Sequence, residues 1–142
     1  MKILVLNGPN LNMLGIREPE LYGAQSYDAL CGAIRAHAEE LGVTVDIRQS
    51  NHEGVLVDWI QEAYGNFDGI VLNAAAYTHT SVAILDALKA IQLPAVEVHL
   101  TDINQREPFR RVSYPGLYCQ ASFIGLGFSG YLRALDWLCG KN

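Results

Sequence analysis

Lysine is scarce in this chain, and no segment is rich in basic residues. Its lysines are Lys2, Lys89 and Lys141, and the formal net charge at pH 7 is -5. Proteins that bind nucleic acids or anionic membranes usually carry clustered cations. The chain has neither a basic run nor a basic helix face, so we expect no nucleic-acid partner and no membrane partner. Any anionic ligand must be held by a few locally placed cations.

Cysteines and long apolar runs are also few. Cys31, Cys119 and Cys139 are widely spaced and include no C-x-x-C pair, so we expect neither disulfide bonds nor a zinc site. No apolar stretch approaches the roughly 18 residues that a membrane span needs, and Met1 leads directly into a strand pattern. These features predict a cytoplasmic protein with reduced thiols.

The composition predicts a folded chain with a substantial core. Half of the residues are hydrophobic, which excludes disorder and suits a single domain over residues 1–142. Strand and helix patterns alternate along it. The expected strands are 2–7, 43–49, 69–74, 94–100 and 119–125. The expected helices are 27–41, 53–64, 81–91 and 129–139.

Two of the expected helices begin with capping signals. Ser26 precedes the pattern at 27–41 and is the candidate N-cap residue. Ser50 and Glu53 have the S-x-x-E spacing of a capping box, which predicts the start of the helix that runs to about Tyr64.

Alternating strands and helices predict an α/β fold with a parallel sheet covered on both faces. Right-handed crossovers and five strands favour a three-layer, flavodoxin-like architecture with strand order 2-1-3-4-5. Ligands of such sheets bind outside the carboxyl ends of the strands. The polar residues expected at that edge are Asn7, Asn10, Gln49, Ser50, Asn73, Glu97, His99, the turn 78–81 and the arginines after residue 100. This set suits a small, oxygen-rich anionic ligand.

Each of these side chains also has a purely structural interpretation. Asn7 and Asn73 are able to terminate strands by bonding to turn backbone, and His79 is able to begin a helix. Glu97 and His99 alternate along one strand and therefore share a face, as a structural or as a catalytic pair. A carboxylate that holds one imidazole nitrogen fixes the tautomer and leaves the other nitrogen to exchange a proton. The convergence of separate loops favours a ligand site.

The segment NGPNLNMLGIREPELYG, from Asn7 to Gly23, is long for a connection in a compact domain. Connections beyond roughly 12–15 residues usually act as lids or binding loops, or are disordered. Tyrosine titrates near pH 10, so a tyrosine base near neutrality needs its pKa lowered by roughly three units, or about 4 kcal/mol. One guanidinium about 4 Å away supplies about that much at an effective dielectric near 20. Arg17 is thus able to activate Tyr22 in a closed lid hinged at Gly15 and Gly23; the alternative is a solvated loop.

Nucleotide-binding signals are weak. GLGFSG at 125–130 matches G-x-G-x-x-G, but the remaining chain has no room for the strand and acidic residue that follow a dinucleotide-binding fingerprint. The first loop has no Ser/Thr/Gly run for a phosphate, and the strand ends carry Asn where an acidic Mg²⁺ pocket needs Asp. A nucleotide-binding signalling module is therefore disfavoured, and we expect no metal ion.

Six motifs occur in order between residue 2 and about residue 138: N-G-P-N-L-N-x-L-G-x-R-E-P-x-x-Y-G, R-Q-S-N, A-Y-T-H-T-S, E-V-H-L-T, R-E-P-F-R and G-Y-L-R-A-L. Together they resemble the type II 3-dehydroquinate dehydratases. The resemblance implies anti elimination of water from 3-dehydroquinate to give 3-dehydroshikimate through an enolate, without metal or organic cofactor, in the shikimate pathway of aromatic biosynthesis or in quinate breakdown. It also implies a homododecamer built as a tetramer of trimers. A non-catalytic protein that binds quinate-like acids is the alternative.

The resemblance assigns roles to individual residues. Tyr22, as tyrosinate beside Arg17, would remove the C2 proton, and a water near Asn10 would stabilise the enolate. His99, oriented by Glu97, would protonate the departing C1 hydroxyl. The implied substrate-binding residues are Asn73, His79, Asp86, Leu100, Thr101, Arg106 and Arg110, of which Asp86 reaches a neighbouring subunit's site.

The lysine scarcity agrees with this class, because the other dehydratase class forms a Schiff base with a lysine and no lysine here is placed for it. Some positions depart from the family's pattern. Ala75 and Ala76 stand where the family often has glycine, and Thr101 replaces a common serine but keeps the hydroxyl. The segments 102–105 and 115–122 are atypical, and we expect them to affect substrate-edge and subunit contacts.

Overall fold

The computed structural model of the chain describes residues 1–16 and 25–141. Arg17 and Tyr22 therefore lie outside the described residues. Five parallel strands form one sheet in the order β2-β1-β3-β4-β5, which confirms the predicted topology. The strands are β1 (Lys2–Asn7), β2 (Thr44–Gln49), β3 (Gly69–Asn73), β4 (Ala95–His99) and β5 (Ala121–Ile124).

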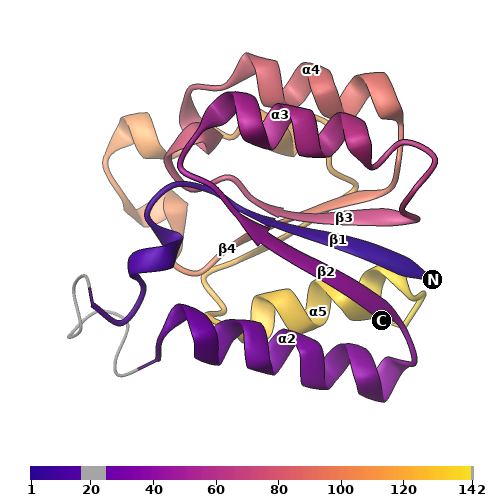
Figure 1. Cartoon of the computed structure of the whole chain (residues 1–142). Helices are drawn as coiled ribbons and strands as arrows, with labels where there is room; N and C mark the ends of the chain where they lie inside the picture. Colours follow the sequence, from indigo (N-terminus) through magenta and orange to yellow (C-terminus); the bar gives the residue numbers. More distant parts are fainter. Residues whose placement is uncertain (17–24, 142) are drawn as a thin grey trace.

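Helices cover both faces of the sheet and make the fold three-layered. Figure 1 shows α3 and α4 on one face and α2 and α5 on the other. Their bounds are α2 (Tyr27–Leu41), α3 (Glu53–Glu62), α4 (Val82–Ile91) and α5 (Ser129–Leu138). None of the helices in the described part of the chain is long and apolar enough to cross a bilayer.

The hydrophobic core is divided in two by the sheet. Alternate residues of β1 point to opposite faces, so Leu4 packs in the cluster that includes α3 and α4, whereas Val5 packs in the cluster that includes α2 and α5. All residues of β3 and β4 are buried, as expected for central parallel strands covered on both faces. This double burial is why their sequences are nearly continuous apolar runs rather than alternating ones.

The capping predictions had different outcomes. Ser26 is the N-cap residue of α2 and accepts a hydrogen bond from the Ala29 amide at 3.1 Å, as predicted. The prediction of a capping box at Ser50 and Glu53 is wrong. Helix α3 begins only at Glu53, and the Ser50 hydroxyl accepts from the His52 amide at 3.0 Å. The serine thus stabilises the turn after β2. This local hydrogen bond uses the hydroxyl that a capping box would need.

Strand β5 is shorter than the predicted 119–125. The Cys119 amide donates to the Pro115 carbonyl at 3.0 Å, so this residue still belongs to the turn of η5 (Pro115–Leu117). At the other end, Gly125 has a φ of 77°, a left-handed conformation that glycine adopts readily and that ends the strand.

Short 3₁₀ helices gather in the loops that follow the strands. They are η1 (Leu11–Met13), η2 (Ala75–His79), η3 (Ile103–Gln105), η4 (Pro108–Arg110) and η5. The loops after β1 and β3 are locked together, because the Gly8 amide donates to the Asn73 carbonyl at 2.8 Å and a Cβ on Gly8 would overlap the Ala74 carbonyl. The carboxyl edge of the sheet is thus a closely packed platform.

Candidate active site

A cavity of about 200 Å³ opens at the carboxyl edge of the sheet, between η1, η2 and the loop after β4. Most of the residues predicted for a ligand site form its wall. These are Asn10, Asn73, His79, His99, Leu100, Thr101, Arg106 and Arg110. The wall also includes Pro9, Leu11, Ala75, Ala76 and Ile103.

Some of the other predicted residues are described by the structure but do not line this cavity. Glu97 is next to His99 but is not part of the cavity wall, and Asp86 is exposed on α4, also outside the wall. Arg17 and Tyr22 lie outside the described residues. A second hollow, of about 340 Å³, runs along β5 and α5 and is lined by none of the predicted residues. The carboxyl-edge cavity is therefore the candidate site.

His99 and Glu97 form a buried pair on one face of β4. The Nε2 atom of His99 lies 2.9 Å from Oε2 of Glu97, and the two residues are 5% and 4% exposed. Burial opposes ionisation of Glu97, but hydrogen bonds from His99, Ser113 and Ser122 outweigh it and hold the pKa of Glu97 below its ordinary value. An ionised carboxylate only accepts hydrogen bonds, so Nε2 of His99 carries a hydrogen. Nδ1 is then left for proton exchange at the cavity.

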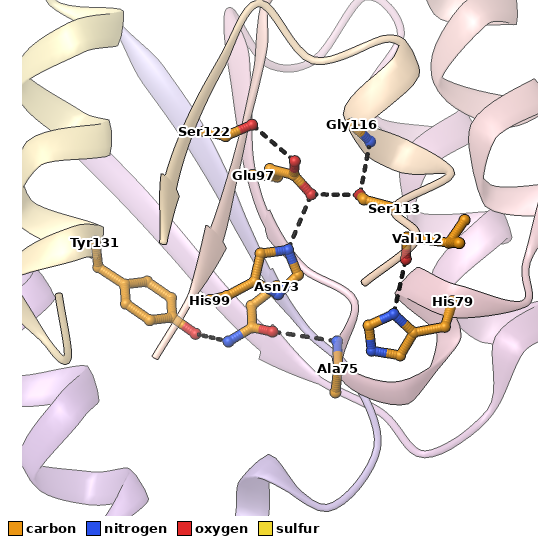
Figure 2. Close-up of polar contacts among 10 residues, drawn as sticks. All are labelled: Asn73, Ala75, His79, Glu97, His99, Val112, Ser113, Gly116, Ser122 and Tyr131. Carbon is orange, nitrogen blue, oxygen red and sulfur yellow. Dashed lines mark hydrogen bonds and ion pairs between the residues drawn. The ribbon is translucent and has the colours of Figure 1, made fainter. Parts of the chain in front are cut away.

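Glu97 has two further partners that the sequence did not reveal. Figure 2 shows Ser113 and Ser122 on either side of its carboxylate. The Ser113 hydroxyl donates to Oε2 and the Ser122 hydroxyl to Oε1, each at 2.7 Å. The sequence places Ser122 in a predicted strand, which is its one indication of this contact. The strand register that sets Ser122 opposite Glu97 cannot be predicted from local periodicity.

The side-chain amide of Asn73 is oriented by a second buried chain of hydrogen bonds. Its oxygen accepts from the Ala75 amide at 3.1 Å, and its nitrogen donates to the Tyr131 hydroxyl at 2.9 Å. Tyr131 in turn donates to Oδ1 of Asn7 at 2.7 Å. Because Asn73 has a second N–H hydrogen, it presents a donor to the cavity.

Asn10 is held by the end of β2. Its φ of 71° is left-handed, which asparagine tolerates better than most residues. The Asn10 amide donates to Oδ1 of Asn51 at 3.0 Å, and Gln49 donates to the same oxygen at 3.1 Å. The Tyr77 hydroxyl donates to the Asn51 carbonyl at 2.8 Å. Asn51, to which the sequence analysis gave no role of its own, therefore connects the loops after three strands.

Arg106 and Arg110 bring positive charge to the cavity wall, and His79 brings a group able to form a hydrogen bond. Nδ1 of His79 lies 2.7 Å from the Val112 carbonyl oxygen, which only accepts, so this nitrogen carries a hydrogen and Nε2 is left for a ligand. Arg106 donates to the Thr101 hydroxyl at 3.3 Å, and Nε of Arg110 donates to Glu107 at 2.9 Å. The neighbouring Arg110 lowers the pKa of Glu107.

Within 1–16 and 25–141, no three His, Cys, Asp or Glu side chains are arranged to hold a metal ion. The chemistry of the cavity wall is that of amides, hydroxyls, imidazoles and guanidinium groups. Fold and cavity together define a flavodoxin-like α/β protein that holds an oriented His–Glu pair beside two arginines.

Comparison with known proteins identifies the family within this class. Residues 1–139 match the family described as dehydroquinase class II. The 3-dehydroquinate dehydratase of Lachnospira eligens is 51% identical over 138 residues, covering 96% of this chain and 94% of that protein. The catabolic 3-dehydroquinase of Aspergillus clavatus is 51% identical over 134 residues, covering 94% of this chain and 89% of that protein.

The fold agrees with a solved relative. The crystal structure of the type II dehydroquinase from Butyrivibrio crossotus superimposes with a TM-score of 0.94 at 48% sequence identity, covering 97% of each chain. The chain therefore belongs to the class II dehydroquinase family, the type II 3-dehydroquinate dehydratases. Its activity is the dehydration of 3-dehydroquinate, a hydro-lyase reaction that serves either a biosynthetic or a catabolic pathway.

Proposed function

We propose that the carboxyl-edge cavity is where 3-dehydroquinate loses water by anti elimination through an enolate. The observation that carries this proposal is the buried His99–Glu97 pair, which lies beside Asn73, Arg106 and the other polar groups of the cavity wall. A carboxylic acid substrate needs cationic and donor groups around it, and a dehydration needs an acid for the leaving hydroxyl.

His99 is the acid in this proposal. Its imidazolium form carries hydrogens on both nitrogens, so Nε2–H stays bonded to Glu97 while Nδ1–H protonates the departing C1 hydroxyl. The anionic Glu97 stabilises the imidazolium and fixes the ring. Its support is the 2.9 Å contact and the lowered pKa of Glu97, which keeps the carboxylate ionised at neutral pH.

Tyr22 is the base, as a tyrosinate beside Arg17, and removes the C2 proton. A water molecule near Asn10 stabilises the enolate that forms. Tyr22 and Arg17 are outside the described residues, and their assignment rests on the motif that contains them. It draws support from η1, because Leu11 and Asn10 of the same motif line the cavity.

The substrate carboxylate is held by Asn73, the Thr101 hydroxyl and the backbone at Leu100. The oriented N–H of Asn73 and the bond from Arg106 to Thr101 support this assignment. His79 and Arg110 contact the ring hydroxyls, and Arg106 supports the closed site.

The assembly and the setting are further parts of the proposal. Residues 1–142 act as a single catalytic domain in a cytoplasmic homododecamer, a tetramer of trimers, and Asp86 reaches the site of a neighbouring subunit. The exposure of Asp86 outside its own cavity wall supports this role. Light scattering of the purified protein measures the assembly; a monomer with full activity would contradict it.

The proposed site is tested by adding 3-dehydroquinate and following the ultraviolet absorbance of the conjugated enone in 3-dehydroshikimate. We expect the wild-type protein to give a rise, and His99→Asn to lose it. We expect Tyr22→Phe to lose turnover while substrate binding, measured by calorimetry, largely survives. Near-normal kcat in either variant would contradict that residue's role. Binding without any absorbance change in the wild type would mean that the cavity only binds the acid.

A further inference from the structure

The segment from Ser113 to Ser122 supplies two hydroxyl donors to the carboxylate of Glu97. Its residues form the turn of η5 (Pro115–Leu117) and enter strand β5. We propose that Ser113 and Ser122, with Gly116 behind them, are positioning residues for the dehydration, which hold Glu97 as a fixed anion so that His99 keeps and aims its proton. This inference rests on the proposed roles of His99 and Glu97.

The hydrogen bond from Ser113 has a defined direction. The Gly116 amide donates to the Ser113 hydroxyl oxygen at 3.0 Å, so this oxygen acts as an acceptor towards Gly116. Its single hydrogen is then directed at Oε2 of Glu97, 2.7 Å away. A backbone amide thus aligns the serine, and the serine aligns the carboxylate.

Ser122 occupies the other carboxylate oxygen. It lies opposite Glu97 in the pairing of β5 with β4, and its hydroxyl donates to Oε1 at 2.7 Å. Oε2 is shared by His99 and Ser113. Hydrogen bonds to an ionised group are shorter and stronger than neutral ones, so with both oxygens engaged the carboxylate is held against rotation and is made a weaker base. The proton of the imidazolium therefore stays on His99.

The backbone passes so close to Glu97 that no side chain fits at Gly116. A Cβ at this position would lie 2.6 Å from Oε1 of Glu97 and 2.9 Å from the Ser113 hydroxyl oxygen. Contacts under 3.0 Å of this kind force the neighbouring groups to move. The segment is therefore shaped around the carboxylate and does not merely pass near it.

The charges around Glu97 leave this task to the serines. Within the described part of the chain, His99 is the basic side chain that pairs with Glu97. The other ionisable neighbour is the Cys119 thiol, whose pKa is raised to about 12 by burial and by Glu97 itself, so it remains neutral. Hydroxyl donors thus provide the stabilisation that a lysine or arginine would otherwise supply.

The inference is tested with isosteric variants at Ser122. This residue is exposed on β5, so Ser122→Val and Ser122→Thr have nearly the same shape, suit a strand, and differ in the hydroxyl. We expect Ser122→Val to lower kcat about tenfold, the scale of one hydrogen bond to a charged group, with KM unchanged. The acidic arm of its profile of urea stability against pH should move up by roughly one pH unit, because Glu97 then protonates at higher pH. Ser122→Thr should retain both properties.

A double variant and two controls complete the test. Ser113→Ala combined with Ser122→Val should lose about 100-fold in kcat, whereas Ser129→Ala, whose hydroxyl donates to the Leu126 carbonyl, should leave the profile unchanged. Circular dichroism checks that each variant is folded. A folded Ser122→Val with wild-type kcat and pH profile would overturn the inference. If His99→Asn is inactive in the same assay, the proposed acid stands; if it is active, the proposed site fails first.

Discussion

Asn73 and Tyr131 are joined by a hydrogen bond of 2.9 Å between the Asn73 amide nitrogen and the tyrosine hydroxyl oxygen. The two residues are 58 positions apart in the chain, and Tyr131 is only 1% exposed. The bond turns one N–H of Asn73 inward and leaves the other for the cavity. A residue of the last helix thereby orients the amide that the end of β3 presents to the cavity.

Tyr131→Phe removes this bond and leaves the amide of Asn73 and the oxygen of Asn7 without their buried partner. We expect a loss of about 1–3 kcal/mol in unfolding free energy, because buried polar groups left unpaired are costly. We also expect KM for 3-dehydroquinate to rise about fivefold. Urea denaturation and steady-state kinetics measure the two effects.

The matched control is Tyr118→Phe. The Tyr118 hydroxyl donates to the Leu93 carbonyl at 2.6 Å, just before β4 begins and thus at the opposite edge of the sheet from the cavity. This variant should also lose stability but should keep its KM. An equal rise of KM in both variants would show that the Tyr131 effect is not specific to Asn73.

Ala75 adopts a left-handed conformation with a φ of 52°. This backbone costs a residue with a Cβ about 1–2 kcal/mol, whereas the extra freedom of glycine in the unfolded chain costs about 0.5–1 kcal/mol. We expect Ala75→Gly to leave the unfolding free energy unchanged or to raise it by up to about 1.5 kcal/mol. Ala76→Gly, at a neighbouring position without positive φ, should lower it by about 0.5–1 kcal/mol. The same loss in both variants, measured by thermal unfolding, would refute this account.

Glu97 links folding to acid pH. Burial acts against its ionisation, but its three hydrogen bonds prevail and lower its pKa in the folded protein below the ordinary 4.5. A carboxyl group with a lowered folded-state pKa stabilises the fold above its unfolded pKa, and this contribution is lost as the pH falls through the folded value. We expect Glu97→Gln to be less stable than the wild type at neutral pH, with the two curves converging as the pH falls through the lowered pKa of Glu97. Parallel curves of urea stability against pH would contradict the prediction.

Glu107 pairs with both arginines of the cavity wall. Its carboxylate oxygens lie 2.9 Å from Nε of Arg110 and 3.8 Å from Nε of Arg106. Since exposed ion pairs are weak, we expect Glu107→Gln to lower KM only about twofold, with the difference shrinking at high ionic strength. Glu39→Gln, on an exposed position of α2, removes the same charge at another surface and should leave KM unchanged. An unchanged or higher KM in Glu107→Gln would contradict this interpretation.

The fold and the centre of the site were predictable because they depend on local patterns. Buried parallel strands give continuous apolar runs, and the residues that end such strands meet at one edge. That rule alone brings Asn73, Glu97 and His99 together. The family motifs then predicted 3-dehydroquinate as the substrate, and the comparisons with known dehydratases support that prediction.

The parts that escaped prediction depend on how distant segments meet. Ser113 and Ser122 reach Glu97 through the path of a long loop and through the register of β5, neither of which has a periodic signature. Tyr131 belongs to the motif G-Y-L-R-A-L, but the sequence does not show that it contacts Asn73, because this contact forms only when α5 packs on the sheet. The capping box at Ser50 failed because one serine hydroxyl had a nearer amide to bond.

The close fit of Gly116 against Glu97 limits how parts of this chain can be exchanged with those of relatives. Consider a chimera that replaces 115–122 with a segment that lacks a hydroxyl at position 122 or a glycine at position 116. Its turn and strand would form, but the carboxylate of Glu97 would be misplaced. Residues 113–122 and β4 therefore need to be exchanged together, and the junctions of a chimera should fall outside both segments.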